Sequence, residues 1–191
     1  MTFGVLLQPD LILGDCILAL TPEAIVQHGL QGLILDVDDT LVPTTTDAVS
    51  PELMGWVEAV RPHVQLWLAS NNLSESRIGS IAHALELPYF TGAAKPSRRK
   101  LRQALQEMQL PPERVAMVGD RLFTDVLAGN RLGLFTVLVQ PMVNPLSATR
   151  GYPIHSLEVW LSKLIGASFY RDPSPLPTAD PGSPSSDRSP S

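Results

Sequence analysis

The chain has little cysteine, no excess of basic charge and no long apolar run. Its one cysteine, Cys16, excludes an internal disulfide and fits a reducing compartment. With 14 Lys and Arg against 19 Asp and Glu, the net charge of -5 argues against a nucleic-acid binder held by phosphate contacts. The most apolar N-terminal stretch is broken by Pro9, Asp10 and Asp15, so it suits neither a membrane span nor a secretory signal. We therefore expect a cytoplasmic protein that binds no nucleic acid.

The last part of the chain differs in composition from the rest. From Asp172 onward, Pro, Ser and Asp predominate and almost nothing could be buried. We predict a disordered tail over residues 171–191. Residues 1–170 then form one folded domain, which is a suitable length for a single core.

Within that domain, apolar runs alternate with helical patterns. Continuous apolar runs are typical of strands that are buried on both faces of a parallel sheet. The expected strands are 33–37, 64–70, 115–120, 134–139 and an edge strand at 87–92. The alternation predicts an α/β, Rossmann-like parallel sheet of about five strands with helices on both faces.

Helix boundaries are also visible in the sequence. Thr21 and Ser50 each precede a proline, the pattern of an N-cap followed by the first helical position. Ser74 and Ser97 are expected to open two further helices, and Gly29 lies where a helix ending needs a left-handed residue. The apolar segment near Leu6, Leu7, Leu11, Ile12 and Leu13 is expected to be a packed core helix, with a shallow membrane anchor as the alternative.

Polar side chains gather where the predicted strands end. Ligands of such sheets bind beyond the carboxyl ends of the strands, so these positions are the candidates for a site. They are Asp36, Asp38 and Thr40 after the first strand, Ser70 after the second, Lys95 before a helix, and Asp120 and Asp125 after the next strand.

The clustered carboxylates predict a bound cation, since they would otherwise repel one another. Asp36, Asp120 and Asp125 offer hard oxygen ligands, and a backbone carbonyl near Asp38 is a further candidate. Few protein ligands with room for water and phosphate oxygen favour Mg²⁺ over Ca²⁺. The lack of cysteine and histidine in these motifs argues against zinc. Carboxylates, a metal ion and a lysine together suit phosphoryl transfer, in which a carboxylate can be the nucleophile.

Four segments in order, DVDDT, LASNN, AAKP and VGDRLFTD, resemble the motifs of the haloacid dehalogenase (HAD) superfamily of phosphatases. The chain is most similar to subfamily IIIA, which includes the phosphatidylglycerophosphate phosphatases. The resemblance implies that Asp36 is the nucleophile and Asp38 the general acid and base. It also implies that Ser70 binds a phosphoryl oxygen, that Lys95 screens negative charge and that Asp120 binds Mg²⁺. Asp125 would either bind the ion as well or lie directly behind its ligands. Asp39 stands where this group often has asparagine, and we expect it to face solvent or cap the turn.

Motif spacing predicts an open site without a cap domain. Only a flap of residues 42–49, one helix and one strand fit between Asp38 and Ser70, and a helix and short strand fit between Ser70 and Lys95. An open site favours a phosphate carried on something large, such as a lipid in a bilayer. A basic patch of Arg98, Arg99, Lys100 and Arg121 could then support peripheral contact with a membrane surface.

The expected function is therefore a Mg²⁺-dependent phosphomonoesterase acting on a phosphorylated substrate such as phosphatidylglycerophosphate. A receiver-like phospho-accepting domain is the alternative from signalling. Sugar, nucleotide and protein phosphates remain alternative substrates, and a phosphotransferase or an inactive scaffold remain alternative roles. The sequence does not indicate the oligomeric state.

Overall fold

The computed structural model describes residues 3–142, and the predicted tail at 171–191 lies outside them. Six parallel strands form one sheet in the order β1-β6-β5-β2-β3-β4. The strands are β1 (Leu11–Ile12), β2 (Gly32–Leu35), β3 (Gln65–Ala69), β4 (Tyr89–Phe90), β5 (Val115–Gly119) and β6 (Phe135–Leu138). The prediction of an α/β, Rossmann-like parallel sheet is confirmed.

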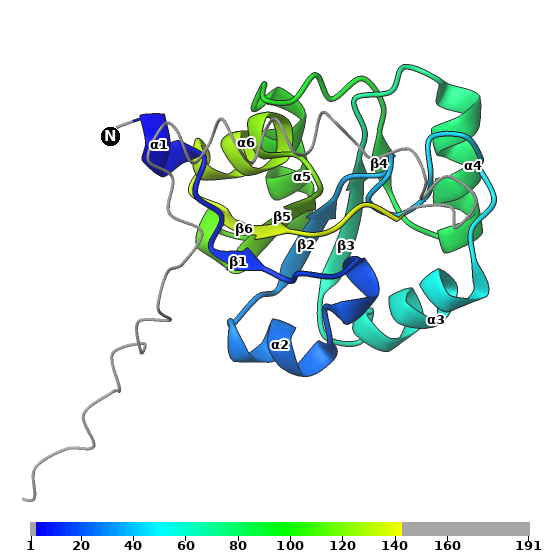
Figure 1. The fold of residues 1–191 in the computed structure, drawn as a ribbon, viewed down its shortest axis with the longest axis horizontal. Coiled ribbons are helices and arrows are strands. Elements are labelled where there is room, and N and C mark those ends of the chain that lie inside the picture. Colours follow the sequence, from blue (N-terminus) through cyan, green and yellow to red (C-terminus); the bar gives the residue numbers. More distant parts are fainter. Residues whose placement is uncertain (1–2, 143–191) are drawn as a thin grey trace, which may run out of the picture.

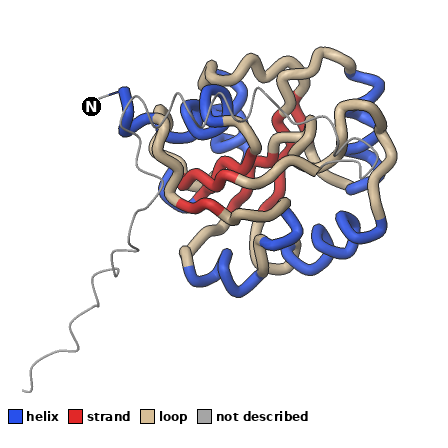
Figure 2. Tube along the Cα trace, in the orientation of Figure 1, coloured by secondary structure: helices blue, strands red, loops and turns tan. Residues whose placement is uncertain are grey.

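Helices cover both faces of this sheet (Figures 1 and 2). The α-helices are α1 (Phe3–Leu6), α2 (Pro22–Gln27), α3 (Pro51–Val60), α4 (Glu75–Leu85), α5 (Arg99–Met108) and α6 (Leu127–Asn130). Two 3₁₀ turns, η1 (Ile17–Ala19) and η2 (Pro112–Arg114), and one π-helical turn, η3 (Leu122–Val126), connect them.

The alternation of side chains along β2 divides the core into two layers. Leu33 and Leu35 point to the layer that contains α2, α3 and α4, whereas Ile34 points to the layer that contains α5 and α6. All three side chains are fully buried, as expected for a central parallel strand covered on both faces. The carboxyl end of β2 is therefore held rigidly from both sides.

Most predicted helix boundaries are confirmed by their caps. Thr21 Oγ1 accepts from Ala24 N at 3.3 Å, and Ser50 Oγ accepts from Leu53 N at 3.2 Å. Ser74 caps α4 in the same way, and Gly29 has the left-handed φ of +63°. Such caps satisfy amide groups that have no partner within the helix.

Two predictions about local structure are wrong. The helix expected to open at Ser97 begins at Arg99, because the Ser97 amide closes a turn onto Ala94 O at 2.9 Å. The N-terminal apolar segment is not a core helix, since Leu11 and Ile12 form the edge strand β1 beside β6. With β1, the sheet has six strands instead of the five that the sequence predicts. Leu7 is fully buried against η3 and α6, so it is not free to act as a membrane anchor.

No cap domain interrupts the described part of the chain between the first motif and Lys95. The flap and α3 fill the space before β3, and α4 and β4 follow it. Over residues 3–142 we also find no helix with the length and apolar character needed to span a bilayer.

Candidate active site

The carboxyl ends of β2 and β5, which are neighbours in the sheet, bring two aspartates together. Asp36 directly follows β2 and Asp120 directly follows β5. Thr40 connects them, because its Oγ1 lies 3.3 Å from Asp36 Oδ2 and 3.3 Å from Asp120 Oδ1. These three side chains are buried, so the carboxylates have little access to bulk water.

Asp125 completes an acidic triad with Asp36 and Asp120. One carboxylate oxygen from each of the three lies within 4.8 Å of the other two, a separation that a metal ion could bridge. Asp125 belongs to η3 and packs closely against β5, where a Cβ at Gly119 would collide with its carboxylate. Glycine is therefore required at that position for the triad to assemble.

Lys95 is the buried cation of this group. Its Nζ lies 2.5 Å from Asp36 Oδ1 and 2.7 Å from Asp125 Oδ1, with only 1% of the side chain exposed. Asp125 Oδ1 nevertheless accepts no hydrogen bond of normal geometry. Lys95 thus pairs with two of the three carboxylates, and the partly exposed Arg121 lies 3.9 Å from Asp120, so the carboxylates still outnumber the cations beside them. A divalent cation bound by the triad would offset that excess, so these residues fit a metal site.

The pKa values of Asp36, Asp120 and Lys95 differ from those of the free side chains. Burial raises the pKa of Asp36 to about 6, aided by Asp125 and opposed by Lys95. Burial and the charges of Asp36 and Asp125 raise the pKa of Asp120 to about 8. Burial alone would lower the pKa of Lys95, but the two carboxylates beside it raise that pKa, so the lysine keeps its charge. Both pKa shifts arise first from burial, and the neighbouring carboxylates add to them.

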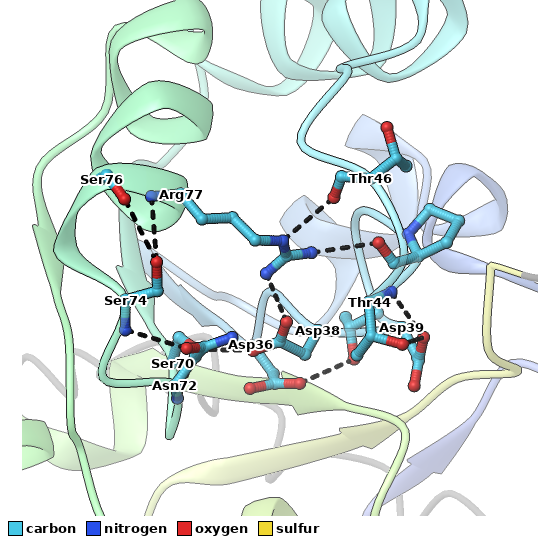
Figure 3. Close-up of polar contacts among 12 residues, drawn as sticks. Asp36, Asp38, Asp39, Thr44, Thr46, Ser70, Asn72, Ser74, Ser76 and Arg77 are labelled. Atoms are coloured by element: carbon cyan, nitrogen blue, oxygen red, sulfur yellow. Dashed lines mark hydrogen bonds and ion pairs between the residues drawn. The ribbon is translucent and has the colours of Figure 1, made fainter.

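The Asp38 carboxylate lies beside Arg77, which reaches across to the flap (Figure 3). Its Oδ2 accepts a hydrogen bond from Ser70 Oγ at 2.8 Å, and its Oδ1 lies 2.5 Å from Arg77 Nη1. Ser70, fully buried after β3, also accepts from Asn72 N at 2.9 Å. The two aspartates that flank Val37 therefore occupy different environments. We call Asp38, Ser70 and Arg77 the flap side.

Comparison with known proteins identifies the family. A HAD-hydrolase-like family model matches residues 92–153. "Probable phosphatase YqeG" of Bacillus subtilis (strain 168) is 35% identical over 126 residues, covering 65% of this chain and 73% of that protein. The chain belongs to the HAD-like hydrolases. The prediction of a HAD superfamily phosphatase, a phosphoric monoester hydrolase, is confirmed.

Two further comparisons concern a second curated relative and a solved structure. "Phosphatidylglycerophosphate phosphatase 1, chloroplastic" of Chlamydomonas reinhardtii is 30% identical over 129 residues, which is 63% of this chain and 48% of that one. The chain thus spans about half the length of that relative. A solved structure from Vibrio cholerae, titled "putative 3-deoxy-D-manno-octulosonate 8-phosphate phosphatase", aligns with a TM-score of 0.49 at 18% identity. It covers 66% of this chain and 75% of that one.

The HAD-like chain brings most of its predicted site residues into two adjoining groups. Asp36, Lys95, Asp120 and Asp125 lie together, and Asp38 lies with Ser70 on the flap side. Asp38 was expected to contribute to the metal site through a backbone carbonyl, and its carboxylate is not part of the triad. Only its backbone carbonyl remains a candidate ligand.

Asp39 does not face solvent, so that alternative was wrong. It is 7% exposed, and its Oδ1 accepts hydrogen bonds from Thr44 N at 3.0 Å and Thr44 Oγ1 at 3.2 Å. The predicted turn-capping role is the correct one. Its φ of +64° is a left-handed conformation, which Asn and Asp tolerate better than other residues with a side chain.

Sequence reasoning missed Arg77. An arginine in the first turn of a helix reads as a solvated surface residue, yet its side chain is only 15% exposed. A signal was available, since the helix follows directly on the predicted Ser70 loop, which places its first turn beside the site. The predicted basic patch is partly engaged elsewhere: Arg98 Nη1 donates to Arg131 O at 3.1 Å, and Lys100 Nζ lies 4.9 Å from the Phe90 ring centroid.

Proposed function

We propose that the protein is a Mg²⁺-dependent phosphomonoesterase that works through an aspartyl-phosphate on Asp36. The observation that carries this proposal is the convergence of a buried nucleophile candidate, a buried lysine and an acidic triad at one sheet edge. Asp36 would attack phosphorus, and Lys95 would stabilise the negative charge of the nucleophile and of the transferring group. Ser70 would donate a hydrogen bond from its hydroxyl to a phosphoryl oxygen.

Asp38 is proposed as the general acid and base. It would protonate the leaving alcohol in the first half-reaction and take a proton from water in the second. Its carboxylate lies next to the proposed phosphate-binding hydroxyl of Ser70, which supports this assignment. A receiver-like domain would lack this group beside its phosphorylated aspartate, and family membership also argues against that alternative.

Asp36, Asp120 and Asp125 would hold the Mg²⁺, with the backbone carbonyl of Asp38 as a further ligand. When bound, the ion would neutralise phosphate oxygens and orient the phosphoryl group for attack. We expect EDTA to stop turnover and Mg²⁺ to restore it. Ca²⁺ should restore it poorly, because its larger and looser coordination would misplace the phosphate. Turnover unchanged by chelation would exclude this metal assignment.

The proposed substrate is a phosphate carried on a large molecule, with phosphatidylglycerophosphate as the first candidate. Two observations support it: the Chlamydomonas relative is a phosphatidylglycerophosphate phosphatase by name, and residues 3–142 contain no cap domain over the site. A bilayer would supply the water exclusion and orientation that a cap supplies elsewhere. Basic residues near the site would add about 1 kcal/mol each against an anionic surface.

A substrate screen tests this proposal. Lipid, sugar, nucleotide and protein phosphates are compared with and without Mg²⁺, the lipid being presented in anionic vesicles. We expect the highest turnover on phosphatidylglycerophosphate in vesicles. A clear preference for a sugar or nucleotide phosphate would exclude the lipid substrate and leave the phosphatase chemistry intact.

Charge reversal tests the membrane contact separately. Arg98→Glu with Arg99→Glu should reduce turnover in vesicles but not on a small soluble phosphate. Arg114→Glu is the matched control, because Arg114 Nη1 donates one hydrogen bond to Gly29 O, as Arg98 does to Arg131 O. Arg114 directly precedes β5 and thus lies at the opposite edge of the sheet. Equal losses on both substrates would assign Arg98 and Arg99 to folding or general catalysis.

A further inference from the structure

Arg77 connects three parts of the site that are distant in sequence. From the first turn of α4, its guanidinium donates to Thr46 O at 3.0 Å through Nε and to Pro43 O at 3.0 Å through Nη2. Its third nitrogen, Nη1, donates to Asp38 Oδ1. Figure 3 shows the side chain reaching from the helix to the flap, with Asp38 between Arg77 and Ser70. All three guanidinium nitrogens are thus used, and the fork is fixed in one orientation.

The two oxygens of Asp38 are held in different ways. Oδ1 receives a charge-assisted bond from a guanidinium that two backbone carbonyls anchor, which is a strong and directional contact. Oδ2 receives a hydrogen bond from the hydroxyl of Ser70, and a hydroxyl rotates readily to another acceptor. A phosphoryl oxygen near Ser70 would be such an acceptor. Oδ2 is therefore the oxygen that substrate would release, while Oδ1 would stay fixed.

We propose that Arg77 is a positioning residue that aims Asp38 Oδ2 at the leaving group. This inference rests on the proposed acid–base function of Asp38. Once Ser70 has turned to the phosphoryl group, Oδ2 is free to take up a proton from water. In the first half-reaction the Asp36–phosphorus bond forms, the phosphorus–alcohol bond breaks, and this proton moves from Oδ2 to the leaving oxygen. In the second, water attacks phosphorus, its proton moves to Oδ2, and Asp36 is released. Arg77 holds Oδ1 throughout and exchanges no proton.

A purely structural role makes a different prediction. Arg77 also ties the flap to α4, and loss of that connection alone would lower the rate for every substrate by the same factor. Loss of proton donation depends on the leaving group instead, since an alkoxide needs a proton whereas 4-nitrophenolate leaves without one. The ratio of kcat/KM between the two kinds of ester therefore distinguishes orientation of Asp38 from a purely structural connection of the flap to α4. This constant covers only the steps up to formation of the phospho-enzyme.

The experiment measures kcat/KM for an alkyl phosphate and for 4-nitrophenyl phosphate. Because positioned proton transfer contributes about 10²- to 10⁴-fold, we expect Arg77→Met to lower the alkyl value by about 10- to 100-fold and the nitrophenyl value by less than about threefold. Arg77→Lys should fall between, since a compact ammonium lacks the separate, planar donors with which the guanidinium reaches its three acceptors. In an Asp38→Asn background, Arg77→Met should cost little more, because the two residues act as a unit.

Arg61→Met is the matched control. Arg61 Nη2 donates to Leu85 O at 2.7 Å and Nη1 lies 3.5 Å from Glu86, so it fastens α3 to the end of α4 away from the strand ends that carry the site. We expect both kcat/KM values to stay close to those of the unmodified protein.

Equal losses on the two esters in a folded Arg77→Met protein, or no loss, would overturn the aiming role. If that variant does not fold, the same ratio measured on Arg77→Lys decides between the two roles. A leaving-group-independent effect of Asp38→Asn would instead refute the acid–base function on which the inference rests. Failure of the acid–base function can be distinguished from failure of the Arg77 role, because Asp38→Asn is measured with Arg77 intact.

Discussion

The metal side of the site, made of Asp36, Lys95, Asp120 and Asp125, adjoins the flap side. The two sides differ in their balance of charge. On the metal side, three buried carboxylates lie beside two cations: Lys95, which pairs with Asp36 and Asp125, and the partly exposed Arg121 near Asp120. The pKa of both Asp36 and Asp120 is raised, chiefly by burial. On the flap side, one carboxylate is paired with one arginine and one hydroxyl. The metal side thus has excess negative charge that a cation can offset, whereas the flap side is neutral within the described residues.

The difference teaches that two aspartates from one motif need not share a role. Asp36 lies in a group that can bind a cation and present a nucleophile, and Asp38 lies in a group that can orient a proton donor. Changes on each side should therefore have different signatures.

Asp36→Asn should have the largest effect, because it removes the proposed nucleophile. The change is nearly isosteric and removes one negative charge from a cluster of three buried carboxylates, so the fold should persist. We expect turnover to fall by at least about 10⁴-fold in steady-state assays, as for loss of a covalent catalyst. Substantial turnover by a pure, folded Asp36→Asn protein would remove Asp36 from this role.

Asp38→Asn should slow both half-reactions by about 10²- to 10⁴-fold, the usual contribution of a general acid and base. It should leave metal affinity nearly unchanged, since the Asp38 carboxylate lies outside the triad. Calorimetric titration with Mg²⁺ measures this second property. Asp120→Asn is the control, and it should weaken Mg²⁺ binding strongly. A large loss of Mg²⁺ affinity in Asp38→Asn would contradict the separation of the two sides.

Much of the metal side could be predicted from the sequence. The carboxyl ends of parallel strands meet at one edge, so Asp36 and Asp120 had to be neighbours once β2 and β5 were recognised as strands. The apolar runs identified those strands because they are buried on both faces. Lys95 and Asp125 followed through the motif resemblance.

The flap side could not be predicted in the same way. The hydrogen bonds from Arg77 to Pro43 O and Thr46 O depend on the path of the irregular flap. A periodic pattern of apolar residues predicts helices and strands but not the path of such a segment. The burial of Asp39 depends on a left-handed turn closed onto Thr44. The strand at Leu11 was missed for a related reason, since two residues are too few for a pattern to distinguish a strand from a helix.

The pH dependence of stability should reveal the charge excess of the metal side. Without metal, the folded protein keeps protons on Asp36 and Asp120 up to pKa values of about 6 and about 8, whereas the unfolded chain releases them near 3.8. The folded state therefore binds more protons in this window, and its stability falls as pH rises from about 5 to about 8. Lys95 and Arg121 keep their charge throughout, since the pKa of each is raised.

Thermal melting in EDTA checks this prediction, with Tm expected to be lower at about pH 8 than at about pH 5. Added Mg²⁺ should raise Tm more at the higher pH, because metal and protons compete for the same carboxylates. Asp120→Asn should flatten both trends. A Tm in EDTA that stays constant or rises with pH would show that the triad is not overcharged in solution.

Asp39 lies between the two sides and should respond least. Its Oδ1 holds Thr44 on the flap, and its Oδ2 lies 3.7 Å from Arg121 Nη2, which in turn lies near Asp120. In Asp39→Asn the amide oxygen can still accept from Thr44, and asparagine tolerates the φ of +64°. We expect turnover and Tm close to those of the unmodified protein. Asp39→Ala should instead lose about 1–2 kcal/mol of stability, because it loses the turn bonds and strains the left-handed residue. Urea unfolding of both variants measures the difference. Equal destabilisation by the two would mean that the charge of Asp39, rather than its turn geometry, stabilises the flap.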